Sequence, residues 1–599
     1  MPVEPDWDMT PYFPEFDGSE YREFRASLIA DVANFLGEVR SAAPLSDQTS
    51  STWAALLARL EEIASRSAHL HSYLGCLGAA DARDQGIQRE AAAAAALGAE
   101  ISKIFVALRA AFREAEGDVF ERLVGRPELA DAAHYLRRVR RRAEWSMSES
   151  LETLAADLGI TGISAWGRLY DQVSGKLEFE LKPPGEAPRR LPVSMTRTLL
   201  EDASREVRSA ALEGSNAAWE GIGDVAAACL NAIAGTRLEL YRRRRVGHFL
   251  EPAVFDAGIS RFTLDTMLEV VRSRWEVPRR YLRRKARILG LERLGFQDLM
   301  APLPIESQAR ISWEGARDRV LSAFEGFYPE LRDFAHQAFE RRWIDYQPRP
   351  GKRPGGFCST SKLIGESRVF MTYSGALGDV ATLAHELGHA FHARVLEDAR
   401  PWASRYPMTL AETASTFAEQ LVIDAVLESP DARPEDRAAM LDSRMQDGSA
   451  FLLNIPMRFL FERAVYEERA AGELTVSRLG ELMAEAQRTC YGDCLSGDEL
   501  DAWFWASKLH FYLTGISFYN FPYTFGYLFS LGIFARAKRE GPSFFPIYQK
   551  LLRMTGSDSA ENLARSHLGV DLEAPDFWNA SIDLIESDLL RFEEATGAL

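Results

Sequence analysis

Cysteine is scarce in this chain, and a surplus of basic residues is missing. Only five cysteines occur among 599 residues, and Cys490 and Cys494 are one residue too far apart for the usual C-x-x-C zinc knuckle. This composition argues against a disulfide framework and is typical of a protein whose thiols stay reduced. The stretch Met1–Glu20 also lacks the basic start and the apolar run of a signal peptide. We therefore expect a cytoplasmic protein.

The charge balance is acidic. Asp and Glu outnumber Lys and Arg by 87 to 70, and the formal net charge is −17. Nucleic acids and anionic membranes are bound mainly through clustered lysine and arginine, so the composition argues against both as partners. Three arginine-rich runs are interpreted as solvated helix faces that pair with neighbouring acids. These runs are Arg137–Arg142, Arg242–Arg245 and Arg279–Lys285.

Apolar residues recur at three- and four-residue spacing along most of the chain, which predicts a mainly α-helical protein. Ser51–Ala80 and Gln88–Glu116 are expected to form an antiparallel helix pair. Gly175–Thr196 combines an alternating strand pattern with turn residues, which predicts a β-hairpin. SRVFMTY at Ser367–Tyr373 predicts a further strand, which is either buried or an edge strand to which a peptide backbone pairs.

The clearest chemical signal is HELGH at His385–His389, which matches H-E-x-x-H. Side chains four residues apart on a helix project from one face, so the two histidines are placed to bind one tetrahedral zinc ion. Glu386 stands next to them without binding the metal, near the position of a zinc-bound water.

The segment around this motif has the pattern of a helix. Leu383, Leu387 and Phe391 repeat every four residues and predict a buried face next to the ligand face. Asp379 is expected at the N-cap or in the first turn, and it is also a candidate partner for a ligand histidine. Gly388 weakens the helix by about 1 kcal/mol relative to alanine, which is tolerable if another segment packs closely there.

A hydrolytic zinc site of this type needs a third protein ligand and an open position for water. The metzincin pattern H-E-x-x-H-x-x-G is excluded, because His392 occupies the position of the glycine. A helical pattern at Met408–Leu427 carries Glu412 and, two turns further along the same face, Glu419. Glu412 is the preferred third ligand and Glu419 the alternative. His392 is not expected to bind the metal. We expect it either to support a ligand or to lie in a polar channel with its hydrogen bonds made.

An aromatic stretch, Leu509–Ala535, contains no Asp, Glu, Lys or Arg and carries six phenylalanines, four tyrosines and His510. It is long enough to span a bilayer, which takes about 20 apolar residues, but its polar groups and helix breakers make it a poor span. We interpret it as mixed, with phenylalanines in the core and His510 and some tyrosines over the reacting bond. Gly515, Pro522 and Gly526 predict a break between helices.

Several motifs together resemble one known family. HELGHAFH followed by LAETASTFAE at this distance resembles the thimet oligopeptidase/oligoendopeptidase F family of zinc metallopeptidases. KRPGGFCST before these motifs and HFYLTGISFYNFPYTFGY after them also match the family, and Ser146–Val173 is similar to the N-terminal domain of its oligoendopeptidase F branch. The resemblance implies a mainly α-helical, two-lobed fold with a deep central channel and a small β-sheet beside the zinc helix.

The resemblance also assigns roles to residues of this chain. Three residues would bind one Zn²⁺ ion per chain: His385, His389 and Glu412. Glu386 would be the general base, and Ser415 would complete the E-x-x-S motif of the third ligand. A histidine and tyrosines of the aromatic stretch would hold the substrate and stabilise the transition state. The candidates for these roles are His510, Tyr519, Tyr523 and Tyr527.

By the same resemblance the chain divides into three regions. Residues 1–110 form an N-terminal helical hairpin region, residues 111–196 an oligoendopeptidase F-type domain with the β-hairpin, and residues 197–599 the zinc metallopeptidase catalytic domain. We expect an endopeptidase that acts on short, unstructured peptides, with no nucleic-acid or membrane partner. Two alternatives stay open: a zinc carboxypeptidase or aminopeptidase on a similar fold, and a non-catalytic zinc-stabilised peptide-binding protein. The presence of Glu386 argues against the second.

Overall fold

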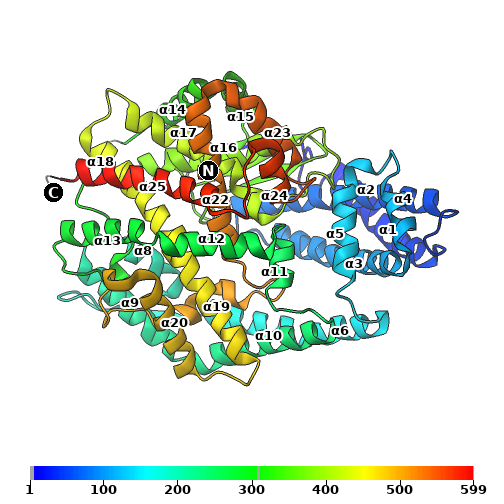
Figure 1. Cartoon of the computed structure of the whole chain (residues 1–599), viewed down its shortest axis with the longest axis horizontal. Coiled ribbons are helices and arrows are strands. Elements are labelled where there is room, and N and C mark those ends of the chain that lie inside the picture. Colours follow the sequence, from blue (N-terminus) through cyan, green and yellow to red (C-terminus); the bar gives the residue numbers. More distant parts are fainter. Residues whose placement is uncertain (1–5, 306–309, 598–599) are drawn as a thin grey trace. The chain divides into compact units, whose positions relative to one another are not determined.

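The computed structural model describes residues 6–305 and 310–597. In them the protein is mainly α-helical, as expected (Figure 1). It also contains one two-stranded and one three-stranded sheet. The chain divides into two compact units, in agreement with the expected two lobes, and the channel stays a prediction. The first unit comprises Met1–Ser146, Ala309–Glu428 and Ile533–Val570, and the second comprises Met147–Gln308, Ser429–Gly532 and Asp571–Leu599.

The first unit begins with helices that share an apolar core. α1 (Ser19–Ser41), α2 (Ser50–Ala80) and α3 (Gln85–Glu114) contact one another, and α2 and α3 are the predicted helix pair. Phe35 and Ile104 are fully buried in this core. The other described α-helices of the unit are α4 (Gly117–Val124), α5 (Ala133–Ala143), α14 (Trp313–Phe327), α15 (Pro329–Glu340), α16 (Leu377–Val395), α17 (Ser415–Glu428), α23 (Phe545–Met554) and α24 (Ala560–Leu563).

The second unit contains the predicted β-hairpin. β1 (Glu178–Leu181) and β2 (Arg189–Pro192) pair antiparallel, and Phe179 and Leu181 pack against Ala211. The described α-helices of this unit are α6 (Glu149–Thr161), α7 (Ile163–Ser174), α8 (Thr196–Leu200), α9 (Arg205–Glu220), α10 (Gly223–Arg243), α11 (Glu251–Asp256), α12 (Arg261–Ser273), α13 (Glu276–Ile288), α18 (Pro434–Ser449), α19 (Ile455–Arg469), α20 (Val476–Tyr491), α21 (Phe504–Ser507) and α25 (Pro575–Ala595), and α22 (Phe521–Glu540) has residues in both units.

The three-stranded sheet belongs to the first unit and has the order β3 (Ile344–Asp345), β5 (Glu366–Phe370), β4 (Phe357–Ser361). β5 pairs parallel with β3 and antiparallel with β4, so the predicted SRVFMTY strand is the central one. Its interpretation as an edge strand is therefore wrong, and the buried alternative is confirmed. The sequence hides this because β3 is two residues long and too short for an alternating pattern. β4 and β5 both contact α16, which confirms a small sheet beside the H-E-x-x-H helix.

α16 buries the face that the sequence predicts. Leu383 and Leu387 are fully buried, and Phe391 is 3% exposed. Asp379 lies in the first turn, and its Oδ2 accepts hydrogen bonds from the backbone N–H and the hydroxyl group of Ser374, both at 2.7 Å. Asp379 therefore caps the helix, and these cap contacts, not a ligand histidine, engage its carboxylate.

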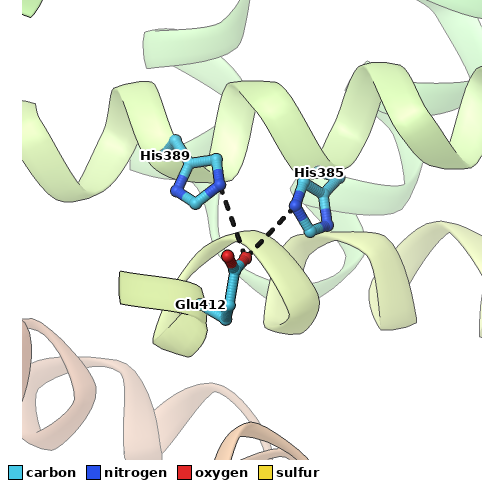
Figure 2. A group of neighbouring side chains, drawn as sticks. All are labelled: His385, His389 and Glu412. Carbon is cyan, nitrogen blue, oxygen red and sulfur yellow. Dashed lines mark ion pairs between the residues drawn. The ribbon is translucent and has the colours of Figure 1, made fainter. Parts of the chain in front are cut away.

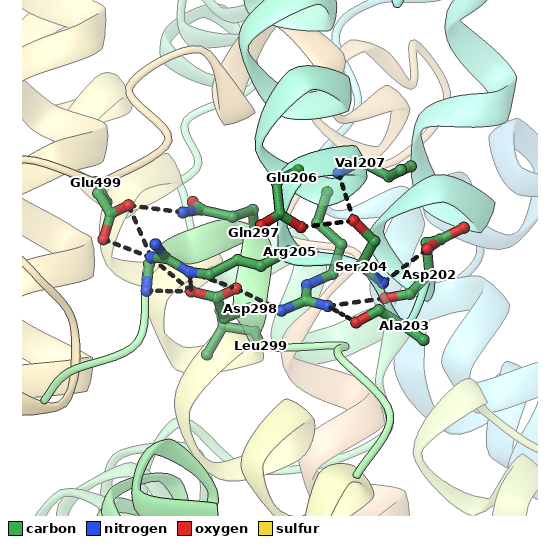
Figure 3. Close-up of polar contacts among 12 residues, drawn as sticks. Asp202, Ala203, Ser204, Arg205, Glu206, Val207, Gln297, Asp298, Leu299 and Glu499 are labelled. Atoms are coloured by element: carbon green, nitrogen blue, oxygen red, sulfur yellow. Dashed lines mark hydrogen bonds and ion pairs between the residues drawn. The ribbon is translucent and has the colours of Figure 1, made fainter. Parts of the chain in front are cut away.

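A buried polar network joins three stretches of the second unit (Figure 3). The carboxylate of Asp298 is fully buried and accepts hydrogen bonds from Arg205 Nε at 3.0 Å and from Arg208 Nη2 at 2.9 Å. Arg205 also donates from Nη2 to Glu499 Oε1 at 2.8 Å. Removing one partner of a buried pair leaves an uncompensated charge, which typically costs about 3–5 kcal/mol. The network therefore fixes the start of α9 against the segments around residues 298 and 499.

The stretch Leu509–Ala535 is not one continuous helix. A 3-10 turn spans Leu509–Tyr512, an irregular segment follows, and α22 begins at Phe521. Pro522 stands in the first turn of α22, where a missing N–H is harmless. The predicted break is found at 513–520, but the expectation that Gly526 belongs to it is wrong, because this glycine lies inside α22.

One helix in the described part of the chain is long and apolar enough to cross a membrane, by length and composition only. It is α3, and it contacts α1, α2 and α5. A single helix of this kind is weak evidence for a membrane span, and it is not the aromatic stretch that the sequence singles out.

Candidate metal centre

Two imidazoles and one carboxylate converge in the first unit (Figure 2). His385 and His389 project from consecutive turns of α16, and Glu412 approaches from a 3-10 turn, Met408–Thr413. The Nε2 atoms of the two histidines lie 3.3 and 3.5 Å from Glu412 Oε2, and one donor atom from each residue lies within 4.8 Å of the others. All three side chains are about a quarter exposed. Two imidazole nitrogens and one carboxylate oxygen form the ligand set of a catalytic zinc site with an open position.

The segment that carries Glu412 lies against α16 at Gly388. A Cβ atom at Gly388 would lie 2.5 Å from the carbonyl oxygen of Ala414 and 2.6 Å from Cα of Ser415. The expectation that another segment packs closely at this glycine is confirmed. The contact falls where the 3-10 turn ends and α17 begins, so Glu412 is presented by a turn and not by the single helix expected over Met408–Leu427.

Ser415 orients the carboxylate of Glu412. Its hydroxyl group donates a hydrogen bond to Glu412 Oε2 at 2.6 Å, and the serine itself is fully buried. Burial works against the charged form of Glu412, but its hydrogen bond with His385, the charge of His385 and the hydrogen bond from Ser415 lower its pKa to about 2. Glu412 is therefore ionised, as a carboxylate ligand must be.

Glu419 contacts the opposite nitrogen of His385. Its Oε2 lies 3.0 Å from Nδ1 of this histidine. A carboxylate only accepts, so Nδ1 carries a proton and Nε2 is the nitrogen that faces Glu412. Burial alone would lower the pKa of His385, but its hydrogen bonds with Glu412 and Glu419 raise it well above the ordinary value. Glu419 thus has the supporting position that carboxylates usually take behind a ligand histidine.

Glu386 is a buried carboxyl group next to this cluster. It is 7% exposed, and its Oε2 has no hydrogen-bond partner in the part of the chain that the structure describes. A Cβ atom at Gly356, directly before β4, would lie 3.2 Å from its Oε1, so the glycine leaves room beside the carboxyl group. Burial raises the pKa of Glu386 to about 7. The charge of His385 opposes this shift, and the charges of Glu412 and Glu419 add to it.

The two histidines that follow Glu386 on α16 are both held neutral. Burial lowers the pKa of His389 to about 4 and that of His392 to about 3. His392 is fully buried, lies 2.9 Å from the hydroxyl oxygen of Thr555 and stacks on Tyr406 at 4.3 Å between ring centroids. It is packed in the core of the first unit, and the expectation that it does not bind the metal stays a prediction.

A second group of predicted residues gathers in the second unit. The imidazole of His510 lies 5.2 Å from the ring of Tyr519 and 6.2 Å from that of Tyr523, and the two phenol rings are 5.6 Å apart. Tyr527 lies one turn further along α22, is 6% exposed and stacks on Phe451 at 4.4 Å. The structure therefore brings three of these four residues together and leaves Tyr527 in the surrounding core.

Asn520 is a further residue of this group that the sequence pattern does not single out. This residue is 1% exposed, and its Oδ1 lies 2.7 Å from Nδ1 of His510. A signal was present, because Asn520 is the single carboxamide in a stretch without charged side chains. A buried carboxamide needs a hydrogen-bond partner, and His510 is one of the candidates in the same stretch.

Two stretches of the chain match known protein families. Residues 324–584 match Peptidase family M3, and residues 113–179 match Oligopeptidase F. Together the two matches cover more than half of the chain.

Individual proteins of this kind are similar to the chain along most of its length. The Oligoendopeptidase F homolog of Lactococcus lactis subsp. lactis (strain IL1403) is 24% identical over 533 residues, which cover 88% of this chain and 87% of the relative. Oligoendopeptidase F, chromosomal, of Lactococcus lactis subsp. cremoris is 26% identical over 437 residues, covering 71% and 70%. The crystal structure of oligoendopeptidase-F from Enterococcus faecium shares the fold, with a TM-score of 0.73 at 18% identity over 96% of this chain and 99% of that one. The chain belongs to peptidase family M3 and is an oligopeptide-hydrolysing metallopeptidase.

Proposed function

We propose that the protein is a zinc-dependent endopeptidase that cleaves internal bonds of short, unstructured peptides. The observation that carries the proposal is the cluster of two histidines and one glutamate with a buried carboxyl group, Glu386, beside it. The zinc ligands would be His385, His389 and Glu412. Their donor atoms suit zinc, and their partial exposure suits a site with one position open to water and substrate.

Glu386 would act as the general base. Zinc at this site would supply Lewis-acid chemistry, which lowers the pKa of water and polarises the scissile carbonyl group. Glu386 would accept a proton from water at its unpartnered Oε2 and return it to the leaving amine. Ser415 and Glu419 would keep the carboxylate of Glu412 and the imidazole of His385 in fixed orientations.

The position of β4 supports an extended binding mode for the substrate. β4 is an edge strand of its sheet, and it begins directly after Gly356, which lies against Glu386. A peptide that pairs with an edge strand is held through its main chain, which tolerates many side chains. β4 therefore takes the place of SRVFMTY as the proposed edge strand for the peptide backbone.

His510, Tyr519 and Tyr523 are proposed to contact the substrate, as the family resemblance implies. Their clustering in the second unit supports a joint role. A hydroxyl group that stabilises an oxyanion typically contributes about 3–4 kcal/mol to the transition state. The buried and stacked ring of Tyr527 favours packing over catalysis.

We also propose where the protein is located and how its chain is divided. The few cysteines support a cytoplasmic location, and the acidic composition argues against nucleic-acid and membrane partners. The division into 1–110, 111–196 and 197–599 is supported by the family matches, which fall at 113–179 and 324–584.

Metal analysis and peptide cleavage test the proposal together. The purified protein should hold about one zinc ion per chain. A chelator should abolish cleavage of peptides that are blocked at both ends, and added zinc should restore it. Cleavage restricted to peptides with a free terminus would favour a carboxypeptidase or an aminopeptidase, and binding without turnover would favour a non-catalytic protein. Glu386→Gln should keep zinc and lose cleavage, and an active variant would exclude this residue as the base.

A further inference from the structure

The irregular segment Leu513–Asn520 is fastened by buried side chains of α10 and α19. Arg237 of α10 donates hydrogen bonds to two carbonyl groups of the segment, and Glu462 of α19 accepts the backbone N–H of Phe518 at 2.7 Å. Phe518 has a φ of 53°, a left-handed conformation that bulky residues rarely adopt. Such a conformation persists only where the surrounding contacts enforce it, so the segment has one fixed shape.

The segment ends at Asn520, which links His510 to α19. Oδ1 of Asn520 lies 2.7 Å from His510 Nδ1 and 3.3 Å from Nη1 of Arg458. A guanidinium group has donors only, so the amide atom that faces it is the oxygen and not the NH₂ group. Arg458 thereby fixes the carboxamide of Asn520 in one orientation.

This orientation decides which nitrogen of His510 carries a proton. The amide oxygen of Asn520 only accepts, so Nδ1 must donate, and a neutral imidazole then has a bare lone pair at Nε2. His510 is neutral near pH 7, because burial lowers its pKa. The hydrogen bond with Asn520 opposes this shift, and the charges of Lys508 and Arg458 add to it.

We propose that Arg458 and Asn520 are positioning residues that hold His510 as the Nδ1-protonated tautomer, so that its Nε2 accepts an N–H from the main chain of a bound peptide. This inference rests on the proposed function, in which His510 contacts the substrate. A bare Nε2 cannot donate a hydrogen bond to an oxyanion. The donor role therefore passes to the hydroxyl groups of Tyr519 and Tyr523, whose rings flank the imidazole.

The acceptor role is tested with peptides in which one backbone N–H at a time, away from the scissile bond, is replaced by an ester oxygen. At one position the replacement should lower kcat/KM of the wild type about three- to tenfold, the effect of one hydrogen bond, and leave His510→Ala unaffected. If every replacement has the same effect on both proteins, the acceptor role is wrong.

The tautomer is measured directly by nitrogen NMR on protein labelled at its 10 histidines, with the spectrum of His510→Ala to identify the signals of His510. At about pH 8, where the imidazole is neutral, the wild type should show a protonated Nδ1 and a bare Nε2. Asn520→Asp keeps an oxygen acceptor and should keep this tautomer, whereas Asn520→Leu should move the proton toward Nε2. A wild-type His510 with its proton on Nε2 would refute the proposal.

Two arginines of α19 provide a matched pair for the role of the guanidinium. Arg458→Met frees the carboxamide of Asn520 to turn over and should also move the proton of His510 toward Nε2. Arg463 pairs with Glu467 on the exposed surface, and Arg463→Met should leave the tautomer unchanged. An unchanged tautomer in Arg458→Met would remove Arg458 from the proposal. The NMR measurement needs neither zinc nor turnover, so it decides the tautomer even if the proposed peptidase function fails.

Discussion

Replacing Gly388 by alanine should move Glu412 away from the two histidines. The new Cβ atom would lie 2.5 Å from the carbonyl oxygen of Ala414 and 2.6 Å from Cα of Ser415. Both are backbone atoms, which cannot swing aside as the end of a flexible side chain does. The junction between the 3-10 turn and α17 must therefore shift, and Glu412 stands only two residues before it.

Two effects of opposite sign determine the stability of Gly388→Ala. Alanine in place of glycine inside a helix favours folding by about 1 kcal/mol, whereas overpacking of a tight site typically costs about 1–3 kcal/mol. An overlap of about 1 Å with two backbone atoms belongs at the upper end of that range, since carbon atoms in contact stay about 3.5 Å apart. We expect a net loss of about 1–2 kcal/mol in the free energy of unfolding. Zinc affinity should fall by about 10- to 100-fold, as it does when the support of a ligand is disturbed.

Zinc affinity is measured by competition with a chelator of known strength, and stability by thermal unfolding of the metal-free protein. Gly378→Ala is a matched control, because it lies in the same helix and a Cβ atom there meets nothing within 4 Å. This variant should bind zinc as the wild type does and be no less stable. If Gly388→Ala binds zinc with unchanged affinity and unfolds at a higher temperature, the close approach of the two segments does not hold the ligand.

Three further predictions concern single carboxyl groups. Glu419→Gln should lower zinc affinity about tenfold, because an amide supports the Nδ1–H of His385 less well than a carboxylate does; a loss as complete as that of Glu412→Ala in the same chelator competition would contradict their different roles. Asp298→Ala should lower the free energy of unfolding by about 3–5 kcal/mol, and a urea midpoint equal to that of the wild type would exclude a stabilising network. Burial raises the pKa of Glu462 to about 7, so the folded protein retains a proton that the unfolded chain releases near pH 4.5. The retained proton stabilises the folded protein fully below pH 4.5, and this stabilisation is lost as the pH rises through about 7. Over this pH range the free energy of unfolding should therefore fall roughly 3 kcal/mol less in Glu462→Gln than in the wild type. Parallel pH curves for the two proteins would disprove this assignment.

The parts of the metal centre that follow from local spacing were predictable from the sequence. His385 and His389 share a helix face because a helix repeats every 3.6 residues, and the apolar repeat that buries the adjacent face lies in the same short segment. Spacing alone puts Glu412 and Glu419 on the same face, and the family resemblance assigns the third ligand to Glu412. The structure places Glu412 at both Nε2 atoms and Glu419 at Nδ1 of His385.

The features that escaped prediction depend on contacts between residues far apart in the chain. The 3-10 turn at Glu412 is set by the contact of Ala414 with Gly388 on another helix. The central place of β5 depends on β3, whose two residues leave no pattern. The link between Asn520 and His510 depends on the turn at Phe518, whose left-handed conformation is enforced from α10 and α19. Propensity and periodicity describe residues that are close in sequence, so they do not predict such contacts.

During synthesis of the chain, the residues that would bind the metal leave the ribosome long before their own unit is complete. The first unit also requires Ile533–Val570, and the intervening stretch Ser429–Gly532 belongs to the second unit. Within the late segment, Phe545 packs against Phe391 of the H-E-x-x-H helix, with ring centroids 6.0 Å apart. A nascent chain therefore carries the complete H-E-x-x-H motif on an incomplete core. Cotranslational folding of the first unit has to wait until the ribosome has made a large part of the other unit.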